Sequence, residues 1–247
     1  MKLKKGVFMK LENLNTKFMT RNDCYTSNKK IIPKGIMIHS TATPGIMAKM
    51  WFERWNKSFE KKEIQRQVCV HAFVDDLEIW QYLPWDHRGW HAGGSANNTH
   101  IGIEICEPSG FSYSGSKMIG YDIKSNERYF NEALKNAISL CVYLCKIYNL
   151  TEKDIICHSE GFKKSIASNH MDVMHWFPKH NMDMDSFRLE IKKHLDNHPD
   201  IHLDSSNKKT DFKYYRVQVG AFRERKNAAE LVEKLKKSGF DSFITYS

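Results

Sequence analysis

The sequence predicts an α/β domain with a mixed central sheet flanked by helices. Strand-patterned runs alternate with helix-patterned runs, which favours helices packed on a sheet. The clearest helix pattern covers Glu127–Tyr148, where apolar residues recur every three or four positions. The clearest strand pattern begins at His100, where Ile101, Ile103 and Ile105 alternate with Gly102 and Glu104.

The other elements follow from the same periodicities and from turn residues. Gly35–His39 is a short strand before a Thr- and Pro-rich turn, and Trp51 and Trp55 belong to a helical apolar stripe. Two further strands, "QVCVHAFV" and "LEIWQY", are joined by a tight turn at Asp75-Asp76. "WHAGGSANNTH" is a loop, "DIICH" is a strand that ends at His158, and Met184–His198 is a last helix.

The composition changes near residue 199 and divides the chain. We predict a catalytic domain over 1–198, a polar linker over 199–213 and a βαβ unit over 214–247. In the last unit an alternating strand starts at Tyr215, and Leu231 and Leu235 belong to a helical stripe. Gly239 follows as a C-terminal cap, and "DSFITY" is the second strand. About 35 residues rarely bury enough surface to fold unaided.

Composition and charge limit the compartments and partners. No apolar run reaches the roughly 20 residues that cross a bilayer, so we expect no membrane span. The N-terminus lacks the continuous apolar segment of a secretory signal, so we expect synthesis in the cytoplasm. The six cysteines are expected to be reduced, with those in strand-like runs in the core. The net charge of +9 favours polyanions, but no zinc-finger or aromatic RNA-binding motif indicates a nucleic-acid partner.

Several polar residues stand where strands end or face away from apolar residues. His39 and His158 each end a strand, and Glu104 points away from three isoleucines. His170 and Asp172 follow in a loop rich in Ser, Asn and His. Two histidines and one carboxylate, with a fourth position for water, form a known catalytic zinc site. The residues therefore predict a zinc hydrolase, while spacing alone leaves open which of His158, His170 and Asp172 bind the metal.

The order of motifs resembles the zinc-dependent N-acetylmuramoyl-L-alanine amidases of the amidase-2 group, relatives of the peptidoglycan recognition proteins. The matching segments are "MIHST", "HAFVDD", "WHAG", "HIGIEICE", "CHSEG" and "MDVMHWFPKH", over roughly residues 30–190. The resemblance implies an amidase-2-like fold and hydrolysis of the bond between N-acetylmuramic acid and the L-alanine of peptidoglycan. The expected biology is that of a phage endolysin or an autolysin, released to the cell wall through a holin-type pore.

The resemblance also implies roles for individual residues. His39, His158 and Asp172 correspond to the zinc ligands, and Glu104 to the general base. His170 stands where many relatives have an oxyanion-stabilising lysine, and a hydrogen-bond donor there could do the same work. Alternatively, His170 is the third ligand and Asp172 its hydrogen-bonding partner. The substrate groove is expected to include His71, Trp90, His91 and Asn97.

The C-terminal segment "YYRVQVGAF…NAAELVEKLKKSGFDSFIT" resembles a sporulation-related (SPOR) repeat, a module that binds peptidoglycan glycan strands. The full module has two βαβ repeats and this chain has one. The resemblance therefore implies weak binding or a homodimer that completes the module. The alternative function for the whole chain is a non-catalytic peptidoglycan-binding protein of the same fold.

Overall fold

The computed structural model describes residues 11, 13–197, 219–222 and 224–238. The chain divides into two compact units, Met1–Leu203 and Asp204–Ser247, which are treated separately below. The first unit contains the predicted sheet and every candidate site residue.

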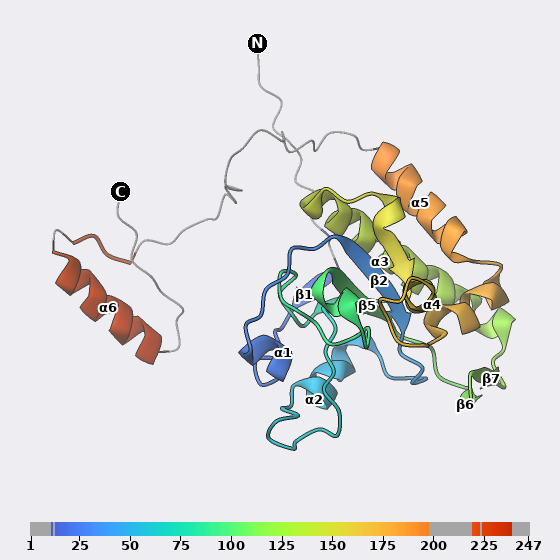
Figure 1. The fold of residues 1–247 in the computed structure, drawn as a ribbon, viewed down its shortest axis with the longest axis horizontal. Helices are drawn as coiled ribbons and strands as arrows, with labels where there is room; N and C mark the ends of the chain where they lie inside the picture. The colour runs from blue at the N-terminus through green and yellow to red at the C-terminus, as the bar shows by residue number, and fades with distance from the viewer. Residues whose placement is uncertain (1–10, 12, 198–218, 223, 239–247) are drawn as a thin grey trace, which may run out of the picture. The chain divides into compact units, whose positions relative to one another are not determined.

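The first unit is built on a mixed six-stranded sheet, as the sequence predicts (Figure 1). The strand order is β1-β4-β3-β5-β2-β8, and among the described strands of this sheet only β3 and β4 pair antiparallel. The Asp75 side chain closes the β3–β4 turn by accepting the backbone N–H groups of Leu77 and Glu78. The strands are β1 Leu14–Thr16, β2 Gly35–Ser40, β3 Ala72–Val74, β4 Ile79–Gln81, β5 His100–Ile105 and β8 Ile155–Cys157.

The helices include all three that periodicity predicts. The long helix α3 (Ile123–Tyr148) starts earlier than expected, because the Asp122 side chain caps it at the Ser125 N–H. The last helix of the unit, α5 (Met184–Asp196), ends two residues before the predicted end. The predicted Trp51–Trp55 stripe forms a short helix, α2. The remaining elements are α1 Asp23–Thr26, α4 His158–Lys163, the hairpin β6 Ser112–Ser114 and β7 Lys117–Ile119, and short 3₁₀ turns.

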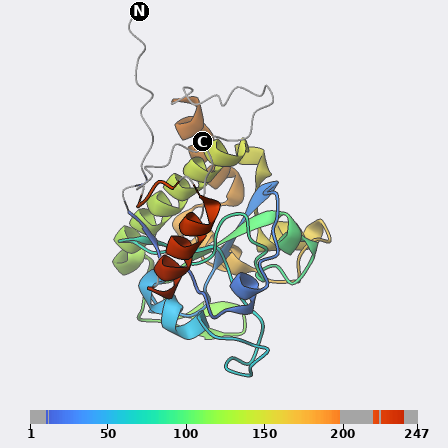
Figure 2. The same ribbon diagram turned by 90° about the vertical axis from the view of Figure 1, so that its left-hand side faces the viewer.

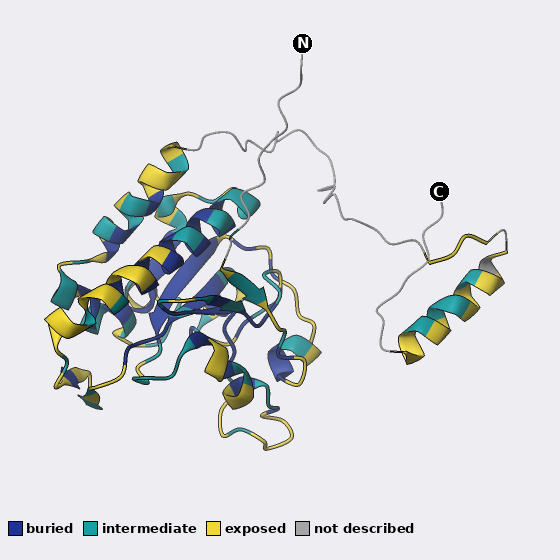
Figure 3. Cartoon of the chain, turned by 180° about the vertical axis from the view of Figure 1, so that it is seen from behind, coloured by how far each residue is buried: buried dark blue, intermediate teal, exposed yellow. Residues whose placement is uncertain are grey.

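The two faces of the sheet are covered differently. Helices α3 and α5 lie side by side in both ribbon views and cover one face with a large apolar core (Figures 1 and 2). Figure 3 shows the buried inner side and the exposed outer side of these helices. Two smaller clusters occupy the other face, one around Trp51, Phe73 and Tyr82, the other around Met37 and Ala92.

Alternate residues of strand β5 face opposite sides of the sheet. Ile101, Ile103 and Ile105 belong to the large core, as predicted. Glu104 faces the other way, beside His39 of β2 in the same register. The imidazole ring of His91 packs directly against Gly102. A Cβ at position 102 would lie only 2.6 Å from Cγ of His91. The site therefore forms on the face opposite the large core.

In the second unit the described residues include one helix, α6 (Arg225–Lys237), where the apolar stripe predicts it. The two predicted flanking strands lie largely or wholly outside the described residues, and Gly239 and the whole predicted linker, 199–213, also lie outside them.

All six cysteines are free and buried, as expected. Within the described part of the chain, no helix is long and apolar enough to span a bilayer.

Candidate metal centre and active site

Sheet topology brings the two strand-end histidines together. Strands β2 and β8 are parallel neighbours, with Ile38 opposite Cys157. The next residue of each strand segment is a histidine, so His39 and His158 meet at the same edge of the sheet. Their Nδ1 atoms lie 3.1 Å apart, and both side chains are buried.

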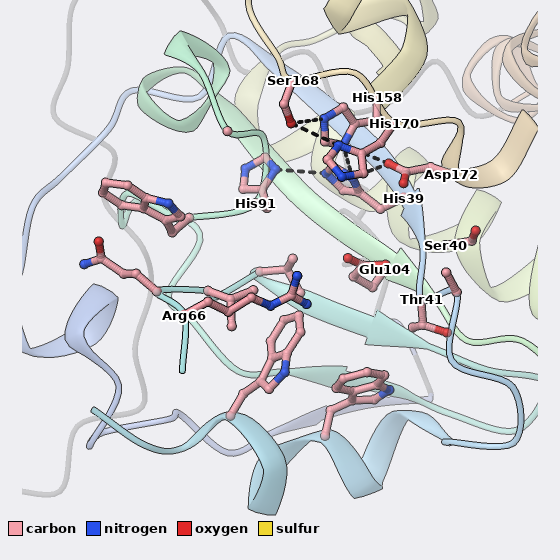
Figure 4. A pocket seen from close by; sticks show the side chains of 18 residues that line it. His39, Ser40, Thr41, Arg66, His91, Glu104, His158, Ser168, His170 and Asp172 are labelled. Atoms are coloured by element: carbon pink, nitrogen blue, oxygen red, sulfur yellow. Dashed lines mark hydrogen bonds and ion pairs between the residues drawn. The ribbon is translucent and has the colours of Figure 1, made fainter. Parts of the chain in front are cut away.

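Asp172 completes the cluster from a separate segment. It begins the 3₁₀ turn η4 (Asp172–His175) and has a left-handed backbone conformation, with φ of 46°. Its Oδ2 lies 2.7 Å from Nδ1 of His39 and 2.9 Å from Nδ1 of His158 (Figure 4). These three side chains form a group that could hold a metal ion, with one donor atom each.

The outer contact of His39 sets its protonation. Nε2 of His91 lies 3.2 Å from the His100 carbonyl oxygen, which only accepts, so His91 carries its proton on Nε2. Nδ1 of His91 therefore accepts from Nε2–H of His39, 2.9 Å away. Burial lowers the pKa of both His39 and His91, which keeps them uncharged. Neutral His39 then presents a lone pair on Nδ1 toward Asp172.

His158 has a corresponding outer contact. Its Nε2 lies 3.1 Å from Oγ of Ser168, and that hydroxyl lies 3.3 Å from the Ala92 carbonyl oxygen, to which it can donate. With Nε2–H of His158 donating to Ser168, its Nδ1 also presents a lone pair to the cluster. Metal-bound histidines usually have such a partner on the second ring nitrogen.

The donor set fits a metal ion. Two imidazole lone pairs and a carboxylate oxygen converge without a proton to share, so a cation would relieve their repulsion. Burial raises the pKa of Asp172, but a proton on Nδ1 of His158 or His39 would pair with the carboxylate and hold that pKa well below its usual range, so Asp172 is ionised and can bind a cation. Ligands around tetrahedral zinc lie about 3.3 Å apart, so the three atoms would need to separate by only a few tenths of an ångström.

Glu104 lines the same cavity and is half-buried. Its Oε2 has no hydrogen-bond partner within the described part of the chain. Burial, and then the negative charges of Asp172 and Glu107, raise the pKa of Glu104 well above its ordinary value. A carboxylate of raised basicity with a vacant acceptor oxygen is suited to taking a proton from water.

His170 lies at the open side of this cluster. It is exposed, its Nδ1 is 3.0 Å from Oγ of Ser168, and its ring centroid is 4.8 Å from that of His158. It is not among the three side chains whose donor atoms converge. The arrangement therefore favours Asp172 over His170 as the third donor.

The four predicted groove residues separate into two pairs. Trp90 and His91 line the cavity. His71 is fully buried: its Nδ1 accepts the Gly102 N–H at 3.0 Å and its Nε2–H donates to the His87 carbonyl oxygen at 2.7 Å. Asn97 is also buried and accepts the backbone N–H groups of His91 and Ala92. His71 and Asn97 support the wall and do not line the cavity.

The cavity has a volume of about 290 Å³ and includes residues that sequence reasoning did not assign to the groove. Arg66 precedes the predicted strand "QVCVHAFV" in a segment without regular periodicity, and Gln67 begins that strand pattern, of which the structure forms only Ala72–Val74 as β3. Figure 4 shows Arg66 and Glu104 facing the same space as the histidine cluster. Trp51 and Trp55, predicted to be core residues, are buried and also line this space.

The 14 positions from His158 to Asp172 are accounted for by α4 and an anchored return loop. Ser168 N–H donates to the Ala92 carbonyl at 2.8 Å, and Ala96 N–H donates to the Ile166 carbonyl at 3.0 Å. These bonds bind the loop to the segment that carries His91.

Family comparisons agree with this architecture. The model described as N-acetylmuramoyl-L-alanine amidase (Amidase_2) matches residues 28–175, which include His39, Glu104, His158 and Asp172. A second model, described as SPOR domain, matches residues 211–247.

Two curated relatives are from Bacillus subtilis (strain 168). N-acetylmuramoyl-L-alanine amidase XlyA is 60% identical over 78 residues, which are 30% of this chain and 25% of XlyA. N-acetylmuramoyl-L-alanine amidase CwlH is 31% identical over 150 residues, which are 58% of this chain and 50% of CwlH. The matches thus span half or less of these relatives' own lengths.

Solved structures show the same fold. The catalytic domain of XlyA superposes with a TM-score of 0.52 at 26% identity, covering 72% of this chain and 99% of that domain. The Staphylococcus aureus hydrolase AmiA, in complex with its ligand, gives a TM-score of 0.56 at 20% identity, covering 75% of this chain and 85% of AmiA. With the amidase model matching more than half of its length, this chain belongs to the N-acetylmuramoyl-L-alanine amidase family.

Proposed function

We propose that this protein is a zinc-dependent amidase that hydrolyses the bond between the lactyl group of N-acetylmuramic acid and L-alanine in peptidoglycan. The observation that carries the proposal is the convergence of His39, His158 and Asp172 in the cavity that the Glu104 carboxyl group also lines. Two imidazoles and a carboxylate are a donor set of catalytic zinc, which polarises a carbonyl and acidifies water when bound.

The protein's own groups would handle the protons of the reaction. Glu104 accepts a proton from the water whose oxygen attacks the amide carbon. Glu104 then passes that proton to the amide nitrogen as the carbon–nitrogen bond breaks. The products are a lactyl carboxylate and a peptide with a free N-terminal alanine. His170, exposed at the cavity edge, donates a hydrogen bond to the oxygen that becomes negative.

The rest of the cavity suits an anionic, amphipathic substrate. Arg66 supplies positive charge opposite the histidine cluster, and a stem peptide carries carboxylates that it could bind. Trp90 offers an aromatic surface at the same opening. We therefore propose that Arg66 and Trp90 hold the substrate, while His71 and Asn97 support the cavity wall.

We further propose that residues 214–247 bind peptidoglycan glycan strands, which the SPOR match over 211–247 supports. A single repeat would bind weakly alone, or two copies of the chain would pair to complete the module. In either case the cell wall is where the enzyme acts, after release as an endolysin or autolysin.

Mass spectrometry of the soluble products from purified peptidoglycan tests the amidase proposal. Free stem peptides with N-terminal alanine are expected, lost with a chelator and restored by zinc. Glu104→Gln, which keeps the side-chain shape, serves as the matched inactive control. Intact peptidoglycan in the presence of zinc-loaded protein would contradict an amidase and favour a binding protein of this fold.

A further inference from the structure

A second buried polar cluster lies beside the candidate metal centre. It consists of Glu107 after β5, Tyr113 of β6 and His175 at the end of η4. The Glu107 side chain is fully buried and that of His175 is 9% exposed. The reaction proposed above uses none of these groups. Buried charged or polar groups are costly unless they are paired, so this cluster needs an explanation.

The contacts of the cluster centre on one atom. Nε2 of His175 lies 3.1 Å from Oε1 of Glu107 and 2.6 Å from the Tyr113 hydroxyl. It also lies 3.3 Å from Oγ of Ser40, the residue after His39. The Tyr113 hydroxyl donates to Oε2 of Glu107 at 2.9 Å. Glu107 thus accepts one donor on each oxygen, and the imidazole Nε2–H is the shared donor.

The cluster is coupled to the metal centre through a single short turn. Asp172 and His175 are the first and last residues of η4. Asp172 has φ of 46°, a left-handed conformation that is uncommon for residues other than glycine, although aspartate adopts it more readily than most. Val173, fully buried between them, fixes the depth of the turn. An apolar contact does not fix rotation of the turn, whereas the directed hydrogen bonds of His175 do.

We propose that Glu107 and His175 form a buried clamp that positions Asp172 as the third metal ligand. The inference rests on the proposed zinc-dependent function and adds residues that act through Asp172 without touching substrate. Tyr113 completes the clamp by donating to the second oxygen of Glu107. A hydrogen-bonded cluster that only stabilises the fold would leave zinc affinity unchanged.

The contacts suggest a matched pair of substitutions. His175→Gln places an amide donor near the position of Nε2, whereas His175→Asn is shorter and places its amide near Nδ1. The two variants are alike in polarity and differ in reach. Zinc dissociation constants of the full chain would be measured by competition with a chromogenic chelator. Each variant would be made with Asp172 intact and with Asp172→Ala, and folding checked by thermal unfolding.

We expect His175→Asn to weaken zinc binding about 10- to 100-fold, the usual effect of losing a partner that supports a metal ligand. His175→Gln should restore binding to within about 3-fold of the parent. In the Asp172→Ala background, His175→Asn should change affinity by less than about 2-fold, since the clamp then has no ligand to position. Tyr113→Phe should weaken binding about 5-fold, as for one lost hydrogen bond.

Zinc binding by His175→Asn equal to that of the parent would overturn the clamp and leave the amidase proposal intact. An equal loss with and without Asp172 would also overturn it, because the effect would then not pass through Asp172. If His175→Asn does not fold, Tyr113→Phe decides, and unchanged zinc affinity in that variant overturns the clamp. Absence of zinc binding by the parent protein would overturn both proposals.

Discussion

The two faces of strand β5 differ in chemistry although they belong to the same six residues. One face presents Ile101, Ile103 and Ile105 to the large core under α3 and α5. The other presents Glu104 to the cavity that the metal-binding groups line, and Gly102 to the ring of His91. The apolar face stabilises the fold by burial, at about 25 cal/mol per Å².

The cavity face carries groups whose burial costs stability. Burial lowers the pKa of His39, His71 and His91 and raises that of Glu104. Each shift means that the folded protein disfavours the charged form of the group. The apolar core under α3 and α5 therefore supplies stability that offsets the cost of burying the polar groups on the cavity face. Substitutions on the apolar face should therefore change the stability of the fold, whereas substitutions on the cavity face should change activity or zinc affinity.

The largest effect is expected from Glu104→Gln. Loss of the general base should reduce the rate of stem-peptide release about 10²- to 10⁴-fold. Zinc affinity and thermal stability should stay close to those of the parent, because the amide keeps the shape of the side chain and Glu104 is not among the three converging metal-binding groups. Retention of more than a tenth of the activity would remove Glu104 from the mechanism. Product release is measured by mass spectrometry and zinc affinity by chelator competition.

The adjacent residue provides the opposite test. Ile103→Ala should lower the free energy of unfolding by about 2–5 kcal/mol, through lost burial and the cavity it leaves. Activity per folded molecule should be nearly unchanged, since Ile103 faces away from the site. Urea unfolding gives the stability. A fall in activity as large as that of Glu104→Gln would show that the two faces are not independent.

Acid should destabilise the metal-free protein through His71. Burial lowers the pKa of His71 from 6.5 to about 4, so between these values the unfolded chain binds more protons than the folded one. Stability is therefore fully present above pH 6.5 and is lost as pH falls toward 4, by about 3 kcal/mol from this residue. Protonation would also break the hydrogen bond that Nδ1 accepts from Gly102.

Urea unfolding in the presence of a chelator, at several pH values, measures this loss. His71→Gln lacks the titrating ring and should show a smaller decline over the same range. Identical pH profiles for the parent and this variant would contradict the assignment.

The smallest expected effect concerns Gly102→Ala. The added Cβ would lie 2.6 Å from the His91 ring, which must shift and weaken its contact with His39. Zinc affinity should fall about tenfold. Ile101→Val, the neighbouring position on the apolar face, is the matched control and should leave zinc affinity unchanged. Equal zinc affinity in both variants would mean that His91 does not support His39.

Much of the fold could be predicted because its signals are periodic. The alternation around Glu104 assigned the two faces of β5 correctly, and two strand-end histidines predicted where parallel strands would meet. Asp172 was harder to place, since it reaches His39 across a loop that carries no strand or helix pattern. Its assignment depended on family resemblance, and its role as a ligand stays a prediction.

The residues around the site were less predictable for physical reasons. His71 and Asn97 are polar residues whose hydrogen bonds go to backbone groups of distant segments, which no local pattern encodes. Glu107 and His175 pair across 68 positions, and neither stands out in sequence. Arg66 enters the cavity from an irregular segment. Such contacts depend on tertiary packing, which the periodicity of a sequence does not predict.

The left-handed conformation of Asp172 limits which substitutions this position accepts without backbone strain. Aspartate and asparagine tolerate such a backbone, whereas most other side chains lose about 1–2 kcal/mol there. Asp172→Asn would therefore alter the charge at this position while leaving the chain path intact. A cysteine, although a good zinc ligand, would carry this backbone cost of about 1–2 kcal/mol at position 172. The shape of one turn thus restricts which ligand chemistries a single substitution can introduce here without strain.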